Sequence, residues 1–370
     1  MSRREKKKNG KKIALVILCF LLVFCILLFA TGFSYWKNIK EAEPEVQDTL
    51  VYDFDDETQP QGLTDDLHFD EIFEGNATEF KASIKEWATN GGDIMYDENV
   101  INVLCIGVDT RNQNTVSGLT DSMIIISVNR KLGTITLSSI MRDSYAYLEA
   151  PDGSGSFNKI NSAFPFYGIN NLINTIESHF KIKIDGYAMI NFALFKAVIE
   201  KLGGVNVTVQ QYEANYINKV YNFNISSGSS VNLNGDEALA FCRSRNCDAD
   251  GDVSRTRRQR QVINALLQKA GAIQTSEITD YIKTFMPYLE TSYKETEVVS
   301  LATKAVVGGW AYFPVQELVL PDEASRKGVS GSTWYWAVDY PLAAKKLQET
   351  IYGKTNITLD ENRVSPIDLT

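Results

Sequence analysis

The sequence predicts an α/β layered domain, with a central mixed β-sheet flanked by helices, that follows one N-terminal transmembrane helix. Three observations support this prediction: a long uncharged run near the N-terminus, strand patterns that alternate with helix patterns from residue 100 to 290, and a hydrophobic fraction of 44%. Alternating strands and helices favour layered α/β packing. The hydrophobic fraction argues against wholesale disorder.

The N-terminus has the pattern of a membrane anchor. Residues 1–12 hold seven Lys and Arg against one acid, and residues 13–33 hold no charged side chain. About 20 apolar residues span a bilayer as a helix, and the basic flank stays in the cytoplasm. A cleaved signal peptide is the alternative, but its apolar region usually has about 7–15 residues. We therefore expect a single-pass cell-membrane protein with a cytoplasmic segment at 1–12, a transmembrane helix at 13–33 and an extracytoplasmic main domain.

Charge excludes one class of partner. The chain has 37 Lys and Arg against 46 Asp and Glu, and without residues 1–12 these become 30 and 45, a net charge of −15. An acidic extracytoplasmic part is a poor nucleic-acid binder. We expect no nucleic-acid partner, and any bound anion must be held by a local basic patch.

The elements follow in order along the chain. Residues 34–98 are predicted to be an acidic stalk or peripheral region, in which Phe80 to Trp87 could form one helical segment but a solvated tether is favoured. Ordered structure is expected from Val100 onward, in a domain at 99–370 with a C-terminal extension. Apolar runs and alternation predict strands, and apolar residues at helical spacing predict helices. The predicted strands are 100–108, 122–129, 133–140, 187–190, 205–209 and 333–338, and the predicted helices are 168–180, 191–202, 234–242, 255–270 and 296–307.

Three cysteines lie beyond the anchor. Cys105 sits in an apolar run and is expected to be a buried small hydrophobe. Cys242 and Cys247 lie five residues apart, and the sequence leaves open whether they form a disulfide or remain two thiols. With only two histidines and no cysteine pair at zinc spacing, a zinc site is not expected.

Arginines cluster near the end of the predicted core. Six of the eleven arginines beyond the anchor lie between residues 243 and 260. Extrapolated at helical spacing, the apolar stripe of 262–270 places Arg255, Arg258 and Gln259 on the side facing the protein and Arg257 and Arg260 on the solvent side.

Inward-facing cations must be paired. The sequence offers two kinds of partner, a phosphate at the helix N-terminus or nearby carboxylates. Arg243 and Arg245 lie just upstream and could add to an anion site. The candidate carboxylates are Asp248, Asp250 and Asp252.

Carboxylates also lie at strand ends, where α/β sheets bind ligands. Asp109 and Arg111 follow the first strand, and Asp121 precedes the second. Two carboxylates suit Mg²⁺, which accepts a few carboxylates together with phosphate oxygens, although Asp is also common in turns and caps. Arg142 and Asp143 end the third strand, with Lys159 close behind. Aromatic residues could line a lipid channel or belong to the core, and they are Phe164, Phe166, Tyr167, Phe192 and Phe195.

The order of these motifs resembles the LytR-CpsA-Psr (LCP) family. Single motifs are weakly specific, but their succession across about residues 100–270 is highly specific. They are VLCIGVDTR at 103–111, TDSM at 120–123, SIMRD at 139–143, NKINSA at 158–163, LGGV at 202–205, LNGDEAL at 233–239, RSR at 243–245 and RTRRQ at 255–259.

The resemblance implies an LCP-type fold and an enzyme that transfers a glycopolymer, such as wall teichoic acid or capsular polysaccharide, from a polyprenyl-pyrophosphate carrier to peptidoglycan. It implies Mg²⁺ held by Asp109 and Asp121, and catalytic roles for Asp109, Arg142, Asp143 and Arg255, with either Asp109 or Asp143 as the base. Two departures from the family pattern are Leu119, where many relatives have arginine, and Met141, where proline is usual. The pyrophosphate would be bound by Arg111, Arg142, Lys159, Arg243, Arg245, Arg255, Arg258 and Gln259.

A polyprenyl-pyrophosphate hydrolase and a non-catalytic lipid sensor or transcriptional attenuator are the alternative functions. The 12-residue cytoplasmic segment argues against direct gene regulation.

Overall fold

The computed structural model describes residues 77–108, 120–270, 289–330, 334–361, 363 and 365. The predicted transmembrane helix at 13–33 lies outside these ranges, as do the cytoplasmic segment and most of the predicted stalk. Within the described ranges, no helix is long and apolar enough to cross a membrane.

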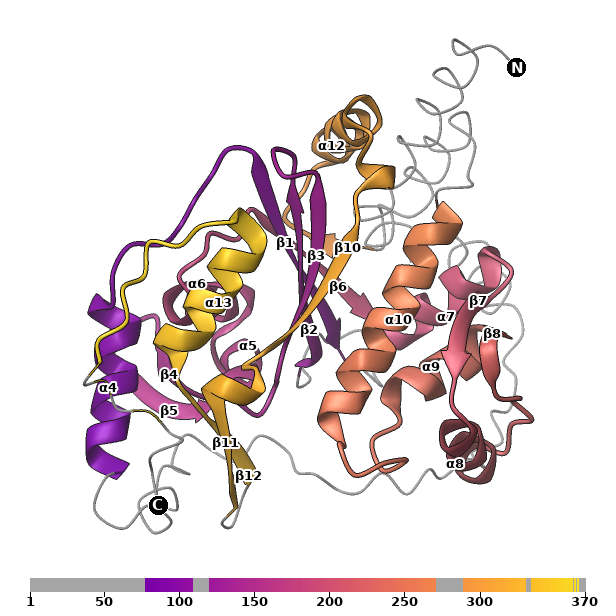
Figure 1. The fold of residues 1–370 in the computed structure, drawn as a ribbon, viewed down its shortest axis with the longest axis horizontal. Helices are drawn as coiled ribbons and strands as arrows, with labels where there is room; N and C mark the ends of the chain where they lie inside the picture. The colour runs from indigo at the N-terminus through magenta and orange to yellow at the C-terminus, as the bar shows by residue number, and fades with distance from the viewer. Residues whose placement is uncertain are drawn as a thin grey trace. The chain divides into compact units, whose positions relative to one another are not determined.

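The described residues fall into two compact units (Figure 1). The sheet unit is drawn from Thr58–Tyr187 and Val315–Thr370, and the helical unit from Ala188–Pro314. Strand β6 (Gly186–Asn191) carries the chain from the first unit into the second.

The main sheet is mixed and has the strand order β10-β3-β2-β1-β6-β9. Its first three strands along the chain pair antiparallel, and β10 runs parallel to β3. Buried apolar residues such as Leu104, Ile125 and Leu137 explain why these segments form strands. The prediction of a mixed sheet flanked by helices is confirmed. The remaining bounds are β1 Val100–Val108, β2 Thr120–Asn129, β3 Thr134–Ile140, β9 Glu290–Thr291 and β10 Val315–Leu320.

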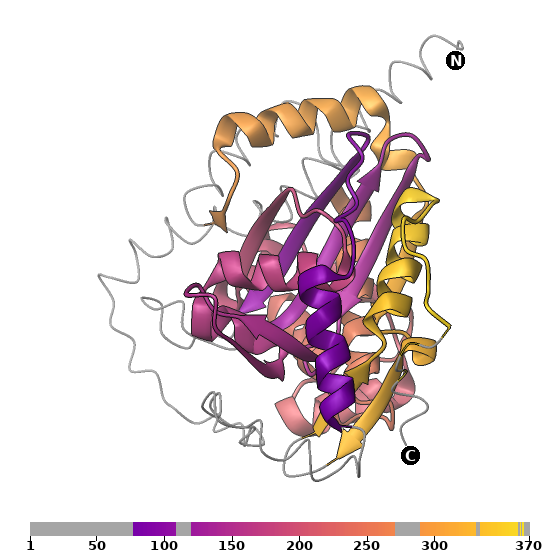
Figure 2. The same ribbon diagram turned by 90° about the vertical axis from the view of Figure 1, so that its left-hand side faces the viewer.

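Helices of the sheet unit cover one face of its strands. Helix α13 (Tyr340–Tyr352) contacts β2 and β3, and α6 (Ile169–Phe180) packs on α13. Figures 1 and 2 show both helices on the same side of the sheet. Phe180 and Tyr340 meet edge to face at a ring-centroid distance of 5.6 Å. The short helices α5 (Ala163–Tyr167) and η2 (Ile160–Ser162) precede α6.

Ordered structure starts earlier than Val100, which corrects the sequence expectation. Helix α4 (Ala77–Asn90) packs against α6, with Phe80 and Ile84 buried. Trp87 donates a hydrogen bond from Nε1 to the carbonyl of His179 at 2.8 Å. These apolar residues recur at helical spacing, and they lie in the helical segment at 80–87 that the sequence left open beside the favoured acidic tether.

Two hairpins of the sheet unit complete the surroundings of the site described below. Strands β4 (Tyr145–Glu149) and β5 (Gly155–Lys159) form the first, which the sequence did not predict. Strands β11 (Arg326–Ser330) and β12 (Trp334–Val338) form the second, after the turn η5 (Glu323–Ser325).

The helical unit is built around α10, which packs on α9 and β7. All three were predicted, and β7 has the predicted bounds. Helix α8 and strand β8 were not predicted. The elements are α7 Phe192–Lys201, β7 Val205–Val209, α8 Gln211–Tyr221, β8 Gly228–Leu233, α9 Gly235–Arg243, α10 Asp252–Ala270, α12 Glu295–Gly308 and η4 Trp310–Tyr312.

Cys105, Cys242 and Cys247 are free thiols, which answers the question left open for the last two. Cys105 is buried as expected. Burial raises the pKa of Cys242 to about 12, although the nearby Arg258 cation opposes this shift.

A buried histidine makes the fold sensitive to acid. His179 is fully buried in α6, contacts the Thr175 carbonyl through Nδ1 at 2.8 Å and accepts from the Tyr147 amide through Nε2 at 3.2 Å. Burial lowers its pKa from 6.5 to about 4.

Between these two pH values the unfolded chain binds more protons at this position than the folded chain. The stability supplied by neutral His179 is therefore complete above pH 6.5 and is lost as the pH falls toward 4. We expect a loss of about 3 kcal/mol over that window, measured by urea unfolding. His179→Gln should flatten this part of the profile, and an unchanged slope in that variant would contradict the assignment.

Candidate functional site

The strand-end carboxylates are only partly within the described structure. Asp109, Arg111 and Leu119 lie outside it, while Asp121 lies on β2. Val108 pairs with Thr120 and Gly107 pairs with Ser122, so the backbone of Asp121 is the extra residue of a β-bulge. Bulges re-aim side chains and are frequent beside active sites.

A buried charge cluster follows the end of β3. The Asp143 carboxylate lies 2.8 Å from Lys159 Nζ through Oδ1 and 3.4 Å from Arg142 Nε through Oδ2. Both Arg142 and Asp143 are buried. Lys159 Nζ also lies over the ring of Tyr335, 5.5 Å from its centroid. Two of the predicted cations, Arg142 and Lys159, therefore contact Asp143, one of the predicted catalytic carboxylates.

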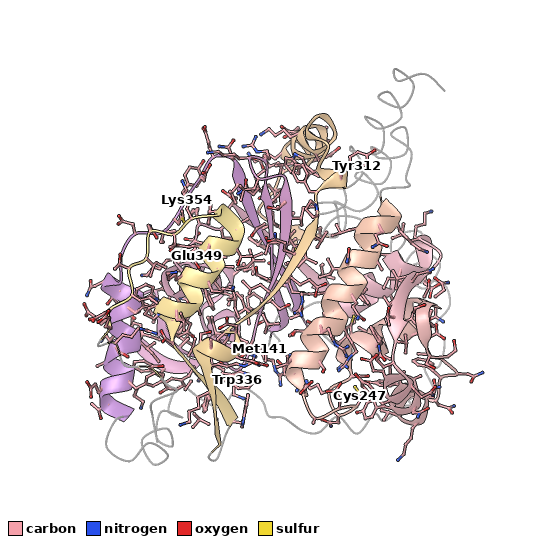
Figure 3. All side chains as sticks on the ribbon, in the orientation of Figure 1. Met141, Cys247, Tyr312, Trp336, Glu349 and Lys354 are labelled. Carbon is pink, nitrogen blue, oxygen red and sulfur yellow. The ribbon has the colours of Figure 1, made fainter. Side chains whose placement is uncertain are left out.

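The backbone fixes this cluster from several elements. The Met141 amide donates to the Leu320 carbonyl at 2.7 Å, and the Trp336 amide donates to the Asp143 carbonyl at 2.9 Å. The Ser144 carbonyl accepts from the Ile160 amide at 2.8 Å, which ties the Lys159 segment to the same turn. Figure 3 shows Met141 and Trp336 at this end of the sheet unit. Met141 is fully buried.

Arg258 forms the centre of a second cluster, in the helical unit. Its side chain is fully buried, and Nη1 contacts Glu213 Oε1 at 3.1 Å and Asp248 Oδ2 at 3.3 Å. Nη2 donates to the carbonyl of Ser244. Arg257 also contacts Glu213 Oε1, at 2.7 Å. The partners of Arg258 are therefore carboxylates, which is one of the two kinds of partner that the sequence offered.

The remaining arginines of the cluster contact nearby groups. Arg255 is buried and lies 2.5 Å from Asp252 Oδ1 through Nη2, while Arg245 Nε lies 3.8 Å from the same oxygen. The guanidinium of Arg243 stacks over Phe192 at 4.3 Å. Gln259 is half-buried. The 243–259 segment thus presents five arginines of intermediate or low exposure in one unit.

Helical phase placed most of these side chains correctly. Arg255 and Arg258 are buried as predicted, but Arg260 is only 5% exposed instead of facing solvent. Helix α10 packs on both α9 and β7, so more of its circumference is covered than a single apolar stripe indicates. Arg257 is half-buried because it reaches Glu213.

Sequence reasoning missed Glu213. This residue is 1% exposed, accepts from Arg257 and Arg258, and accepts from the Gln210 amide at 2.9 Å as part of a capping box. Glutamate at the third position of a helix is the local pattern that could have revealed α8. No local pattern links it to Arg258, 45 residues further along.

Two other expectations depend on residues that are only partly described. Among the described residues, no group of three or more His, Cys, Asp or Glu side chains could hold a metal ion. Phe164 is buried, and Phe166, Tyr167, Phe192 and Phe195 have intermediate exposure. The lipid channel therefore stays a prediction.

The fold and its two clusters define an α/β protein in which buried cations and carboxylates meet at the end of a strand and along an arginine-rich helix. The chain belongs to the LytR_cpsA_psr family, whose model matches residues 71–351.

Two relatives illustrate its similarity within that family. The chain is 25% identical over 342 residues to a protein of Bacillus licheniformis named polyisoprenyl-teichoic acid–peptidoglycan teichoic acid transferase TagU. The aligned region covers 86% of this chain and 96% of the relative. It is 29% identical over 252 residues to biofilm regulatory protein A of Streptococcus mutans, and this aligned region covers 64% of this chain and 60% of the relative.

Solved structures share the fold. Bacillus subtilis TagV matches with a TM-score of 0.55 and 26% identity, over 70% of this chain and 100% of TagV. A structure described as TagT bound to LIIa-WTA matches with a TM-score of 0.56 and 22% identity, over 70% of this chain and 93% of that one.

Proposed function

We propose that this protein transfers an anionic glycopolymer from a polyprenyl-pyrophosphate carrier to peptidoglycan. The names of the teichoic acid transferase relatives support this reaction. The observation that carries the proposal is the buried Asp143 carboxylate, which contacts both Lys159 and Arg142. A carboxylate beside fixed cations at a strand end can accept a proton while its neighbours stabilise phosphate charge.

In the proposed reaction, a hydroxyl of the glycan acceptor attacks the phosphorus that carries the polymer. The hydroxyl proton passes to Asp143, and a new P–O bond joins polymer to acceptor. The bond from that phosphorus to the bridging oxygen breaks, and its electron pair leaves with the polyprenyl phosphate. Arg142 and Lys159 stabilise the charge that develops on the phosphate oxygens. Asp109 is the alternative base.

In the helical unit, we assign pyrophosphate binding to Arg243, Arg245, Arg255 and Gln259. Arg258 differs from them, because its guanidinium already contacts Glu213, Asp248 and Ser244 and is fully buried. We therefore revise its role from direct phosphate contact to positioning of the 243–248 segment against α10.

The proposal includes Mg²⁺ at the strand ends. Asp109 and Asp121 would hold Mg²⁺ together with phosphate oxygens, and the bulge at Asp121 separates this residue from the regular β1–β2 pairing. The ion would neutralise charge on the leaving pyrophosphate.

We expect removal of divalent cations with a chelator to lower the transfer rate by about a hundredfold, since metal stabilisation of transition-state charge supplies several kcal/mol. Added MgCl₂ should restore the rate, and Asp121→Asn should raise the Mg²⁺ concentration needed. An unchanged transfer rate in the presence of the chelator would show that the reaction does not depend on Mg²⁺.

The substrate lipid places the reaction at the membrane. We propose that residues 13–33 anchor the protein in the bilayer, with residues 1–12 in the cytoplasm and the two described units outside it. The carrier lipid in the same membrane would then be within reach of the site.

The test uses the full-length protein in lipid vesicles with a polyprenyl-pyrophosphate-linked polymer, Mg²⁺ and peptidoglycan fragments. Polymer joined covalently to glycan supports the proposal. Release of polymer phosphate without joining would identify a hydrolase, and binding without either product would identify a lipid sensor or regulator.

A further inference from the structure

A pair of tryptophans stands on one face of the β11–β12 hairpin. Trp334 and Trp336 are two residues apart on β12, so their side chains project to the same face, while Tyr335 points to the opposite face. Their rings meet edge to face at a centroid distance of 4.4 Å. Trp334 is 38% exposed although it is a large apolar side chain.

Residues of the facing strand β11 contact both rings. Gly328 pairs with Trp336 across the strands, and a Cβ at Gly328 would lie 3.3 Å from Trp334 Cζ2 and 3.5 Å from Trp336 Cζ3. Both indoles therefore lie against this position, and a side chain here would crowd Trp334. The Arg326 guanidinium covers the Trp336 ring at 4.4 Å from its centroid. Arg326 and Trp334 both support Trp336, and Trp334 is the more exposed of the two rings.

The backbone of the aromatic pair contacts the segment that carries Asp143. The Trp336 amide donates to the Asp143 carbonyl, and Trp336 also forms an isolated bridge with Ser144. Between the two tryptophans, Tyr335 is buried against Tyr145 at 5.3 Å and lies beneath Lys159. The same three-residue stretch thus supports the charge cluster from one face and presents the tryptophans on the other.

We infer that Trp334 and Trp336 form a sugar-binding platform for the glycan strand that accepts the polymer. Indole rings present a wide apolar face that suits the C–H faces of pyranose rings, while the sugar hydroxyls remain free for hydrogen bonds. The inference rests on the proposed function, because it takes peptidoglycan glycan as the acceptor.

The acceptor, rather than the donor polymer, is the occupant that this position favours. In the proposed reaction Asp143 takes a proton from the acceptor hydroxyl, so the acceptor sugar must be held beside Asp143. The donor is held through its pyrophosphate by cationic side chains and needs no aromatic surface. The Trp336 backbone contacts Asp143, whereas the two indoles lie on the opposite face of β12 from Tyr335 and Lys159. The platform would therefore hold units of the glycan strand next to the sugar that reacts at Asp143.

The test measures binding of a neutral oligomer of β-1,4-linked N-acetylglucosamine to the full-length protein in detergent, by calorimetry or saturation-transfer NMR. Trp334→Ala should raise the Kd for this oligomer about tenfold, in the range expected for loss of one aromatic stacking contact. Trp334→Tyr should retain most of the affinity. Tyr312→Ala is the matched control, since Tyr312 is an aromatic residue 59% exposed elsewhere on the chain, and it should leave the Kd unchanged.

Binding and turnover separate this inference from the proposed function. Trp334→Ala should raise the KM for the glycan acceptor and leave the KM for the lipid-linked donor unchanged. If the protein proves unable to transfer polymer, the oligomer Kd still tests the platform.

An unchanged oligomer Kd in a folded Trp334→Ala protein overturns the inference. So does a variant that loses affinity for the donor polymer, for lipid vesicles or for a second copy of the chain while it keeps the oligomer affinity.

Discussion

Asp143→Asn is expected to lower the rate of polymer transfer about a thousandfold. The substitution keeps the size of the side chain but removes the charge that contacts Lys159 and Arg142 and the oxygen that accepts the proton. A positioned general base contributes about 10²–10⁴ in rate. The measurement is the initial rate of glycan-linked polymer formation at saturating donor and acceptor.

Asp152→Asn provides the matched control for this change. Asp152 is an exposed carboxylate in the turn of the β4–β5 hairpin, where it accepts from Ser154, and its loss should leave the rate within about twofold. Donor binding should persist in Asp143→Asn, since the cations remain. Full activity in Asp143→Asn would transfer the role of base to Asp109.

Glu213→Gln is expected to destabilise the protein by about 3–5 kcal/mol. Glu213 is buried and pairs with both Arg257 and Arg258, and removing one partner of a buried ion pair is strongly destabilising. Asp248 still contacts Arg258, so part of the charge remains neutralised. The measurement is the free energy of unfolding from denaturant titration.

Glu237→Gln separates charge pairing from helix capping. Both glutamates occupy the third position of a capping box, Glu213 in α8 and Glu237 in α9, and both accept from the backbone amide of their N-cap residue. Glu237 is half-buried. We expect its replacement to cost about 1 kcal/mol or less. Equal losses in the two variants would show that capping, and not the arginine pairing, accounts for the effect of Glu213→Gln.

The sequence predicted the strands of the main sheet well because their apolar runs are long. The run at Val100–Val108 is a strand with those bounds, and the alternation at Val205–Val209 is also recovered. Strand β8 was missed because its sequence, GSSVNL, carries few apolar residues and most of it is exposed. Helix α8 was missed because only Glu213, Ala214 and Ile217 are buried, so its apolar stripe is narrow.

At the candidate site, the sequence predicted which arginine side chains of α10 face inward more easily than it predicted the groups that they contact. The phase of α10 indicated that Arg255 and Arg258 face inward, and both are buried. The choice between carboxylate and phosphate partners could not be made from the sequence, because Glu213 reaches Arg258 only through the packing of α8 near α10. Arg260 was misplaced for a related reason, since packing on two neighbours covers both sides of the helix.

The nearness of Asp143 to Lys159 was suggested only by the order of motifs. It depends on the β4–β5 hairpin, which pairs Tyr145 with Lys159 and so brings the end of β5 back to the turn after β3. That hairpin has a polar second strand, GSFNK, with no clear alternation, and its register is set by tertiary contacts.

The central claim is that the acceptor is a sugar hydroxyl and not water. Reaction of the full-length protein with lipid-linked polymer and peptidoglycan fragments in ¹⁸O-labelled water tests it most directly, with mass spectrometry of the polymer product. Transfer predicts a phosphodiester between polymer and glycan that carries no ¹⁸O, together with polyprenyl phosphate. A free polymer phosphomonoester that carries ¹⁸O would contradict the claim and identify the protein as a hydrolase.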